Sequence, residues 1–177
     1  DGVAVARFQH EAFSATVPGD PSSAAFLIAA AALTGSEITI TDVGLNPTRT
    51  RFLDVMARMG VRTERSVDRE ELGEPVGRIH VLPSSGVRSV RVERWELPLV
   101  IDEVPMLALL AAHAGSDSWF LDAGELRVKE SDRLEGVATG IRGLGGHAAV
   151  EGDDLVVAGG GLEGGRCDAR GDHRMAM

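Results

Sequence analysis

The chain alternates between segments with a helical hydrophobic pattern and segments with a strand pattern. Residues 17–44, "VPGDPSSAAFLIAAAALTGSEITITDVG", read as a strand end, a helix capped by Asp or Ser and stopped by Gly, and a strand of alternating polarity. Residues 99–124, "LVIDEVPMLALLAAHAGSDSWFLDAG", show the same succession. The pattern therefore predicts an internal repeat.

A second helix and a pair of strands follow each copy. The predicted helices cover residues 47–60 and 128–146, and the strand pairs end in residues 77–83 and 153–159. Each repeat is thus a βαβαββ unit, and we expect an α/β fold of packed layers. A third copy begins at residues 169–177. Because one turn of helix cannot bury an apolar face, this pattern favours a fragment of a longer protein over a short terminal helix.

Three other segments have simple structural interpretations. Residues 66–78 are polar and rich in turn formers, so we expect a hairpin connection. Residues 87–94, "VRSVRVER", alternate Val with Arg, which favours a strand with one solvated face over a basic binding patch. Residues 159–165, "GGGLEGG", match G-x-G-x-x-G, but no amphipathic helix follows, so the pattern predicts a turn.

Composition narrows the possible partners. The 177 residues are 44% apolar, enough for a core in one large or two small domains, and carry a formal net charge of −9. This charge opposes nucleic-acid binding. The longest apolar stretch, residues 24–33, is shorter than the roughly 20 residues of a membrane helix, so we expect no membrane partner. A single cysteine, Cys167, cannot form an internal disulfide, which agrees with a cytoplasmic location.

Polar residues gather where the predicted helices begin. Helix N-termini carry unpaired N–H groups and a partial positive charge, so several of them meeting in one cleft would bind phosphate or carboxylate groups. The residues concerned in the three copies are Ser22 and Ser23, Asp102 and Glu103, and His173 and Arg174.

The second helix of the second copy adds Lys129, Glu130 and Arg133. Lys129 and Arg133 are four residues apart and would share one helix face, where two cations can clamp an anion. The alternative is a solvated first turn in which Glu130 and Asp132 offset the neighbouring cations. The spacing alone leaves both interpretations open.

Three motifs resemble one known family. The segments "GDPSSAAFLIAAAALTG", "ELRVKESDRL" and "DHRMAM" are similar to those of the 5-enolpyruvylshikimate-3-phosphate synthases, and they occur in the same order. The resemblance covers essentially the whole chain but less than half of a full-length member. It implies a two-domain inverse α/β barrel of repeated βαβαββ units. Residues 1–48 would end the N-terminal domain, and residues 49–177 would form a C-terminal domain that is truncated in its third unit.

The resemblance also implies roles for individual residues. Asp102, Lys129 and Glu130 match catalytic groups of the family. Two positions depart from its pattern, since Glu125 stands where many members carry Asn and Phe26 where some carry Tyr. The residues expected to bind substrate are Ser22, Ser23, Asp102, Lys129, Arg133, His173 and Arg174.

The implied reaction moves an enolpyruvyl group from phosphoenolpyruvate to the 5-hydroxyl of shikimate 3-phosphate and releases phosphate. Glu130 is the candidate proton donor, and Asp102 with Lys129 is the candidate proton acceptor. No metal or organic cofactor is expected, and the full-length form is expected to be a monomer. The alternatives are the sister enzyme that acts on UDP-N-acetylglucosamine and a non-catalytic module of the same fold.

Overall fold

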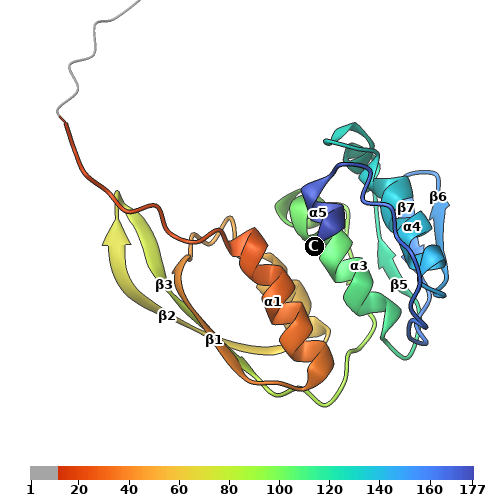
Figure 1. The fold of residues 1–177 in the computed structure, drawn as a ribbon, viewed down its shortest axis with the longest axis horizontal. Coiled ribbons are helices and arrows are strands. Elements are labelled where there is room, and N and C mark those ends of the chain that lie inside the picture. The colour runs from red at the N-terminus through yellow and green to blue at the C-terminus, as the bar shows by residue number, and fades with distance from the viewer. Residues whose placement is uncertain (1–11) are drawn as a thin grey trace, which may run out of the picture.

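Two sheets flank a central pair of helices in the computed structural model of the protein, which describes residues 12–177. Figure 1 shows α1 and α3 side by side between the sheets. The α-helices are α1 (Pro21–Thr34), α2 (Phe52–Arg58), α3 (Val104–Ala112), α4 (Arg133–Gly143) and α5 (His173–Ala176), with short 3-10 turns at Leu97–Leu99, Ile101–Glu103 and Gly124–Val128.

The first repeat forms an antiparallel sheet with the order β1-β3-β2. Its strands are β1 (Ile38–Gly44), β2 (Arg62–Glu71) and β3 (Glu74–Leu82). An isolated parallel bridge between Gly19 and Val43 extends this sheet beyond β1. The hairpin expected in residues 66–78 is present, but its turn is confined to Leu72 and Gly73, and β2 and β3 run through the rest of that segment.

The second repeat forms a sheet with the order β4-β5-β7-β6. Its strands are β4 (Arg91–Val92), β5 (Ser118–Phe120), β6 (Ala148–Glu151) and β7 (Asp154–Val157). In this sheet β4 is parallel to β5, and the other pairs are antiparallel. In the first sheet the bridge at Gly19 is likewise parallel to β1, and the other pairs are antiparallel. The two sheets therefore share one topology, and the predicted α/β repeat is confirmed.

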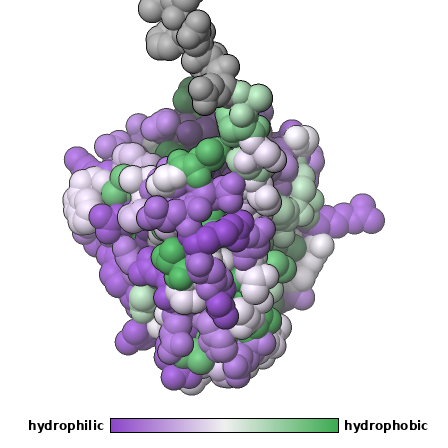
Figure 2. Space-filling model, turned by 90° about the vertical axis from the view of Figure 1, so that its left-hand side faces the viewer, coloured by the Kyte–Doolittle hydropathy of each residue, from purple (hydrophilic) through white to green (hydrophobic). Residues whose placement is uncertain are grey.

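The two central helices are apolar on most of their surface. In α3 every residue except Leu109 is buried, and α1 contributes Ile28 and a series of buried alanines. Alanine keeps helix backbones close together, so one continuous core reaches from Ala24 to Val157. The face that Figure 2 shows, on the side of the three-stranded sheet, is mostly polar, because β2 exposes nearly all its side chains.

Several predicted boundaries are wrong. Residues 87–94 contain only the two-residue strand β4, because the chain there mainly connects the two sheets. The helix predicted from residue 47 begins at Phe52, after a turn in which Asn46 accepts a hydrogen bond from the Thr48 amide at 2.9 Å. The helix predicted from residue 128 begins at Arg133, because Asp132 caps it there.

The predicted division into residues 1–48 and 49–177 falls between β1 and α2. Residues 1–11 lie outside the described residues. Within the described part, β1 pairs with β3 across this point from Ile38–Val81 to Gly44–Val76, and the same core lies on both sides. A domain boundary at residue 48 would therefore cut a continuous sheet, which counts against placing it there.

Candidate active site

The N-terminal ends of α1, α3, α4 and α5 meet in one region of the fold. One contact joins the first two repeats, since the hydroxyl of Ser22 donates a hydrogen bond to Oε1 of Glu103. A second joins α4 to α5, where Arg133 Nε donates to Asp172 Oδ2 at 2.8 Å. The structure thus brings together helix ends that are far apart in the sequence.

Aspartates cap three of these helices. Asp20 accepts from the Ser23 amide at 3.0 Å, Asp132 from the Glu135 amide at 3.0 Å, and Asp172 from the Arg174 amide at 2.9 Å. Each cap satisfies an N–H group that the helix leaves unpaired. The start of α3 has no side-chain cap and is preceded by the 3-10 turn Ile101–Glu103.

Arg133 is the central cation of the site, and its side chain is only 1% exposed. It donates twice to Asp172, at 2.8 and 3.2 Å, once to Asp102 at 3.1 Å, and once to Glu130. Burial opposes its charge, but the bond to Asp172 and the neighbouring carboxylates outweigh this and raise the pKa of Arg133. The arginine therefore holds two candidate catalytic carboxylates, Asp102 and Glu130, next to each other.

The pKa values of the capping carboxyls Asp20 and Asp172 both lie below the ordinary value for aspartate. Burial alone would raise the pKa of the Asp172 carboxyl, but hydrogen bonds from Arg133 and Ser131 lower it overall. Burial likewise raises the pKa of Asp20, whereas hydrogen bonds from Ser23 and the charge of Arg174 bring it below its usual range.

Lys129 does not lie on a helix face with Arg133. Its backbone is extended between the 3-10 turn Gly124–Val128 and α4. Lys129 Nζ lies 3.2 Å from Oε1 of Glu125, the residue that departs from the family pattern. Lys129 is partly exposed, and the neighbouring Glu130 is exposed although its carboxylate accepts from Arg133.

Arg174 and His173 lie at the start of the short helix α5. Arg174 is 9% exposed, and its Nη2 is 3.6 Å from Asp20 Oδ2. Its Nη1 is buried and has no hydrogen-bond partner among residues 12–177. A buried guanidinium N–H without a partner is costly, so it is suited to receiving an anion. The His173 side chain is exposed, and its Nδ1 is 4.0 Å from Asp172 Oδ1.

Ser22, which the sequence analysis expected to bind substrate, is buried inside the protein. It is 1% exposed, and besides donating to Glu103 it accepts from Arg49 Nη2 at 3.1 Å. The structure therefore counts against a direct substrate contact of this hydroxyl. Ser23, in contrast, is exposed at the start of α1, where its hydroxyl donates to Asp20 Oδ2 at 3.0 Å.

Two further residues of the region went unassigned in the sequence analysis. Arg49 lies in the loop before α2, and nothing in its segment marks it as part of the site. The sequence did place Glu103 at a predicted helix start, directly after Asp102. It gave no sign of the contact between Glu103 and Ser22, because the two residues are 81 positions apart. Such a contact follows only from the packing of one repeat on the other.

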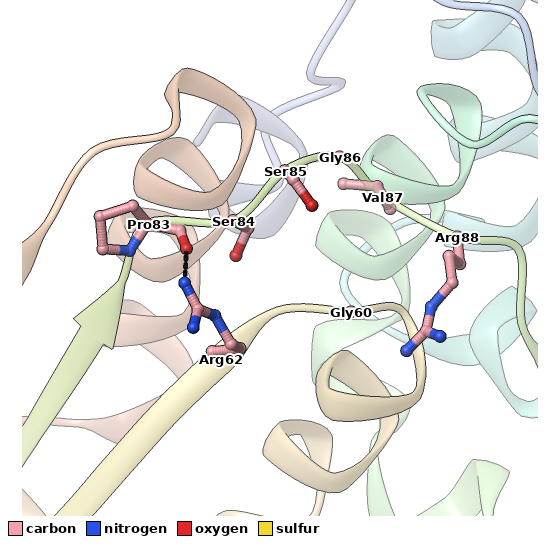
Figure 3. A pocket seen from close by; sticks show the side chains of 8 residues that line it. All are labelled: Gly60, Arg62, Pro83, Ser84, Ser85, Gly86, Val87 and Arg88. Atoms are coloured by element: carbon pink, nitrogen blue, oxygen red, sulfur yellow. Dashed lines mark hydrogen bonds between the residues drawn. The ribbon is translucent and has the colours of Figure 1, made fainter.

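A cavity of about 600 Å³ lies elsewhere, along the segment that connects β3 to β4. Figure 3 shows its lining by Gly60, Arg62 and residues 83–88, with Arg62 donating to the Pro83 carbonyl. A neighbouring cavity shares Ser84–Val87 and reaches Thr34 and Gly35 at the C-terminal end of α1. This cavity is thus at the opposite end of α1 from Ser22 and contains none of the predicted site residues.

Among residues 12–177, no group of three or more His, Cys, Asp and Glu side chains is arranged to hold a metal ion. None of the helices in these residues has the length and apolar character needed to cross a membrane.

The fold, with its repeated units and converging helix ends, defines the chain as an α/β protein of the enolpyruvyl transferase type. An enolpyruvyl transferase from Streptomyces tendae has the same fold at a TM-score of 0.51, with 22% identity over 78% of this chain and 29% of its own. The profile of the family EPSP synthase (3-phosphoshikimate 1-carboxyvinyltransferase) matches residues 3–177. The chain belongs to the EPSP synthase family.

Individual relatives agree with this assignment. The 3-phosphoshikimate 1-carboxyvinyltransferase of Desulforudis audaxviator is 47% identical over 163 residues, which are 91% of this chain and 38% of the relative. That of Roseiflexus castenholzii is 46% identical over 166 residues, 93% of this chain and 38% of the relative. The structure of EPSP synthase from Acinetobacter baumannii superposes with a TM-score of 0.85 at 35% identity, covering 92% of this chain and 38% of that one. The chain thus spans less than two fifths of the length of these relatives.

Proposed function

We propose that this chain supplies one part of the active site of a full-length 3-phosphoshikimate 1-carboxyvinyltransferase. The reaction would transfer the enolpyruvyl group of phosphoenolpyruvate to the 5-hydroxyl of shikimate 3-phosphate, releasing phosphate. Family membership and the names of the relatives support the activity. The covered share of those relatives, 38%, is the reason to assign only a part of the site to this chain.

One observation carries the proposal: carboxylates that can move protons adjoin cations at converging helix N-termini. Asp102 and Glu130 both contact Arg133, and Lys129 precedes Glu130 in an extended segment. Both proposed substrates are anions, so cations and helix ends would bind them while the carboxylates act on the reacting atoms.

In the addition step, the Glu130 carboxyl would give a proton to the methylene carbon of phosphoenolpyruvate. The 5-hydroxyl oxygen of shikimate 3-phosphate would bond to the adjacent carbon, and Asp102 with Lys129 would take the hydroxyl proton. The product of this step is a tetrahedral intermediate with a new methyl group. In the elimination step, one methyl proton would return to a carboxylate, the C–O bond to phosphate would break, and the enol ether would form.

The two arginines would have different tasks. Arg133 already donates to three carboxylates, so its main task would be to hold Asp102 and Glu130 in place. Arg174 has a buried N–H group that finds no hydrogen-bond partner in the described part of the chain, and it would bind the phosphate or carboxylate of phosphoenolpyruvate. Ser23, Lys129 and exposed His173 would complete the substrate contacts. The proposal requires no cofactor and describes a cytoplasmic monomer without nucleic-acid or membrane partners.

Phosphate release by the full-length protein tests the proposal. With phosphoenolpyruvate and shikimate 3-phosphate together, we expect sustained release of one phosphate per enol ether formed. Either substrate alone should give none. Replacing shikimate 3-phosphate with UDP-N-acetylglucosamine distinguishes the sister activity, and turnover only with the nucleotide sugar would contradict the assignment. Absence of turnover with both acceptors would point to a non-catalytic module.

A further inference from the structure

Glu103 is a buried carboxyl to which the proposed reaction gives no task. It is 5% exposed, and Ser22, which donates to it, is 1% exposed. Burying two polar side chains costs free energy unless each finds a partner, and an apolar pair of the same volume would fill this place without that cost. The contact lies between the N-terminal ends of α1 and α3, where the two repeats meet.

A continuous series of contacts leads from Glu103 to the candidate anion ligand. The Ser22 hydroxyl that donates to Glu103 accepts from Arg49 Nη2 at 3.1 Å. The same nitrogen of Arg49 donates to Asp20 Oδ1 at 3.0 Å. The other carboxylate oxygen of Asp20 is 3.6 Å from Arg174 Nη2. These contacts connect the Arg174 guanidinium to Glu103 through Asp20, Arg49 and Ser22.

Glu103 is also linked to Asp102 through the backbone. Both belong to the 3-10 turn Ile101–Glu103, in which the Glu103 amide donates to the Val100 carbonyl at 2.9 Å. Because the Glu103 side chain is fixed to α1, the turn cannot rotate freely. The orientation of the turn determines where the Asp102 carboxylate lies, and Asp102 Oδ1 accepts from Arg133 Nη1 at 3.1 Å.

We propose that Glu103 is a positioning residue, which fixes Arg174 through Ser22 and Arg49 and fixes Asp102 through their common turn. The role deepens the proposed function and rests on it wherever turnover is the readout. The contacts themselves involve no substrate, so they can also be tested in the free protein.

The charges around Glu103 support this role. Burial raises the pKa of Glu103, and the charge of Asp102 raises it further, whereas the Ser22 hydrogen bond and the charges of Arg174 and Arg49 oppose the shift. The charge of Arg174 thus acts on Glu103, as a positioning role requires. The amide oxygen of glutamine can accept the Ser22 hydrogen bond as the carboxylate oxygen does, so Glu103→Gln should keep the geometry.

The first experiment compares Glu103→Ala, Glu103→Gln and Glu96→Gln in the full-length protein. Glu96 is the matched control because it is a partly buried glutamate, 16% exposed, whose ion pair with Arg58 lies outside the site. We expect kcat/KM for phosphoenolpyruvate to fall about 10–100-fold in Glu103→Ala, since small misplacements of substrate contacts have effects of this order. Glu103→Gln and Glu96→Gln should stay within about threefold.

The second experiment needs no substrate and follows the Arg174 Nε–H signal by NMR, assigned with Arg174→Lys. We expect the signal to move in Glu103→Ala, to return in Glu103→Gln and to stay in place in Glu96→Gln. If Glu103→Ala does not fold, Ser22→Ala cuts the same series of contacts and should move the signal likewise. If the protein shows no turnover, the proposed function fails and the NMR signal still decides the positioning role. A lower melting temperature with an unmoved signal would overturn the proposal.

Discussion

At the level of single residues, the site places cations where helices disfavour them. Arg133 is the first residue of α4, and Arg174 is the second of α5, yet the N-terminus of a helix carries a partial positive charge. Buried Asp172 offsets this charge for Arg133, and Asp20 does so for Arg174. The aspartates thus cap the helices and neutralise the arginines at the same time.

Asp172→Asn should remove the main partner of Arg133 and destabilise the full-length protein. Breaking one side of a buried ion pair costs about 3–5 kcal/mol, and the Asp172 side chain is 0% exposed. The folded pKa lies below the ordinary 3.8, so this stabilisation is present above about pH 4 and is lost as the pH falls below it. Urea unfolding at pH 7 and pH 3 measures the difference between wild type and variant, which should shrink in acid.

Asp54→Asn is the control for that measurement. Asp54 pairs with Arg51 at 3.3 Å, but its side chain is 53% exposed. Exposed pairs contribute about 0–1 kcal/mol, so this variant should unfold close to wild type. If Asp172→Asn behaves like Asp54→Asn at pH 7, Asp172 is not the anchor of Arg133.

Glu130→Gln should slow turnover of the full-length protein strongly. Glutamine keeps the volume of Glu130 and can still meet Arg133, but it cannot give a proton to a carbon atom. A general acid contributes about 10²–10⁴-fold, so kcat should fall by that factor with little change in shikimate 3-phosphate affinity. A kcat within about threefold of wild type would remove Glu130 from the mechanism.

At the level of secondary structure, local signals predicted α1 and β1 well. Asp20 and Gly35 bound α1, and both signals act within a few residues of the helix. The same reasoning failed at Lys129, because it extended a helix through residues that precede the Asp132 cap. The predicted helix face shared by Lys129 and Arg133 therefore does not exist.

Contacts between repeats could not be predicted from local signals. The roles of Arg49 and Glu103 depend on which helix ends meet, and this follows from the packing of α1 on α3. The sequence did mark the polar helix starts, so it located the region of the site. It left the individual partners undetermined, because each lies in a different repeat.

Gly77→Ala should destabilise the first sheet. Gly77 lies in β3 where the register of β2 shifts, and a Cβ atom there would be 2.0 Å from the Ser66 carbonyl oxygen. Overpacking of this kind typically costs about 1–3 kcal/mol. Gly115→Ala is the matched control, since no atom of residues 12–177 lies within 4 Å of its added Cβ. Equal melting temperatures of the two variants would contradict this prediction, because they would show that β2 and β3 can move apart at Gly77 without loss of stability.

At the level of the whole molecule, three contacts link the two repeats and the segment around α5 in a ring. Ser22 and Glu103 join the first repeat to the second, Arg133 and Asp172 join the second repeat to the α5 segment, and Arg174 and Asp20 join the α5 segment to the first repeat. All three contacts lie at the N-terminal ends of the helices.

The chain by itself is expected to lack turnover. Both proposed substrates are anions that a complete site would enclose, and this chain spans 38% of the relatives that carry the activity's name. Holding two reactants in register can account for roughly 7–11 kcal/mol of a barrier, which an incomplete site cannot supply. Lys129 and Arg174 should still give weak anion binding that weakens further with added salt.

The most direct test of this account is phosphate release from phosphoenolpyruvate and shikimate 3-phosphate, measured in parallel for the full-length protein and for this chain of 177 residues. We predict sustained release by the full-length protein and none above background for the chain. The chain should nevertheless bind phosphoenolpyruvate weakly, and Arg174→Lys should reduce that binding. Turnover by the chain at a rate near that of the full-length protein would contradict the account.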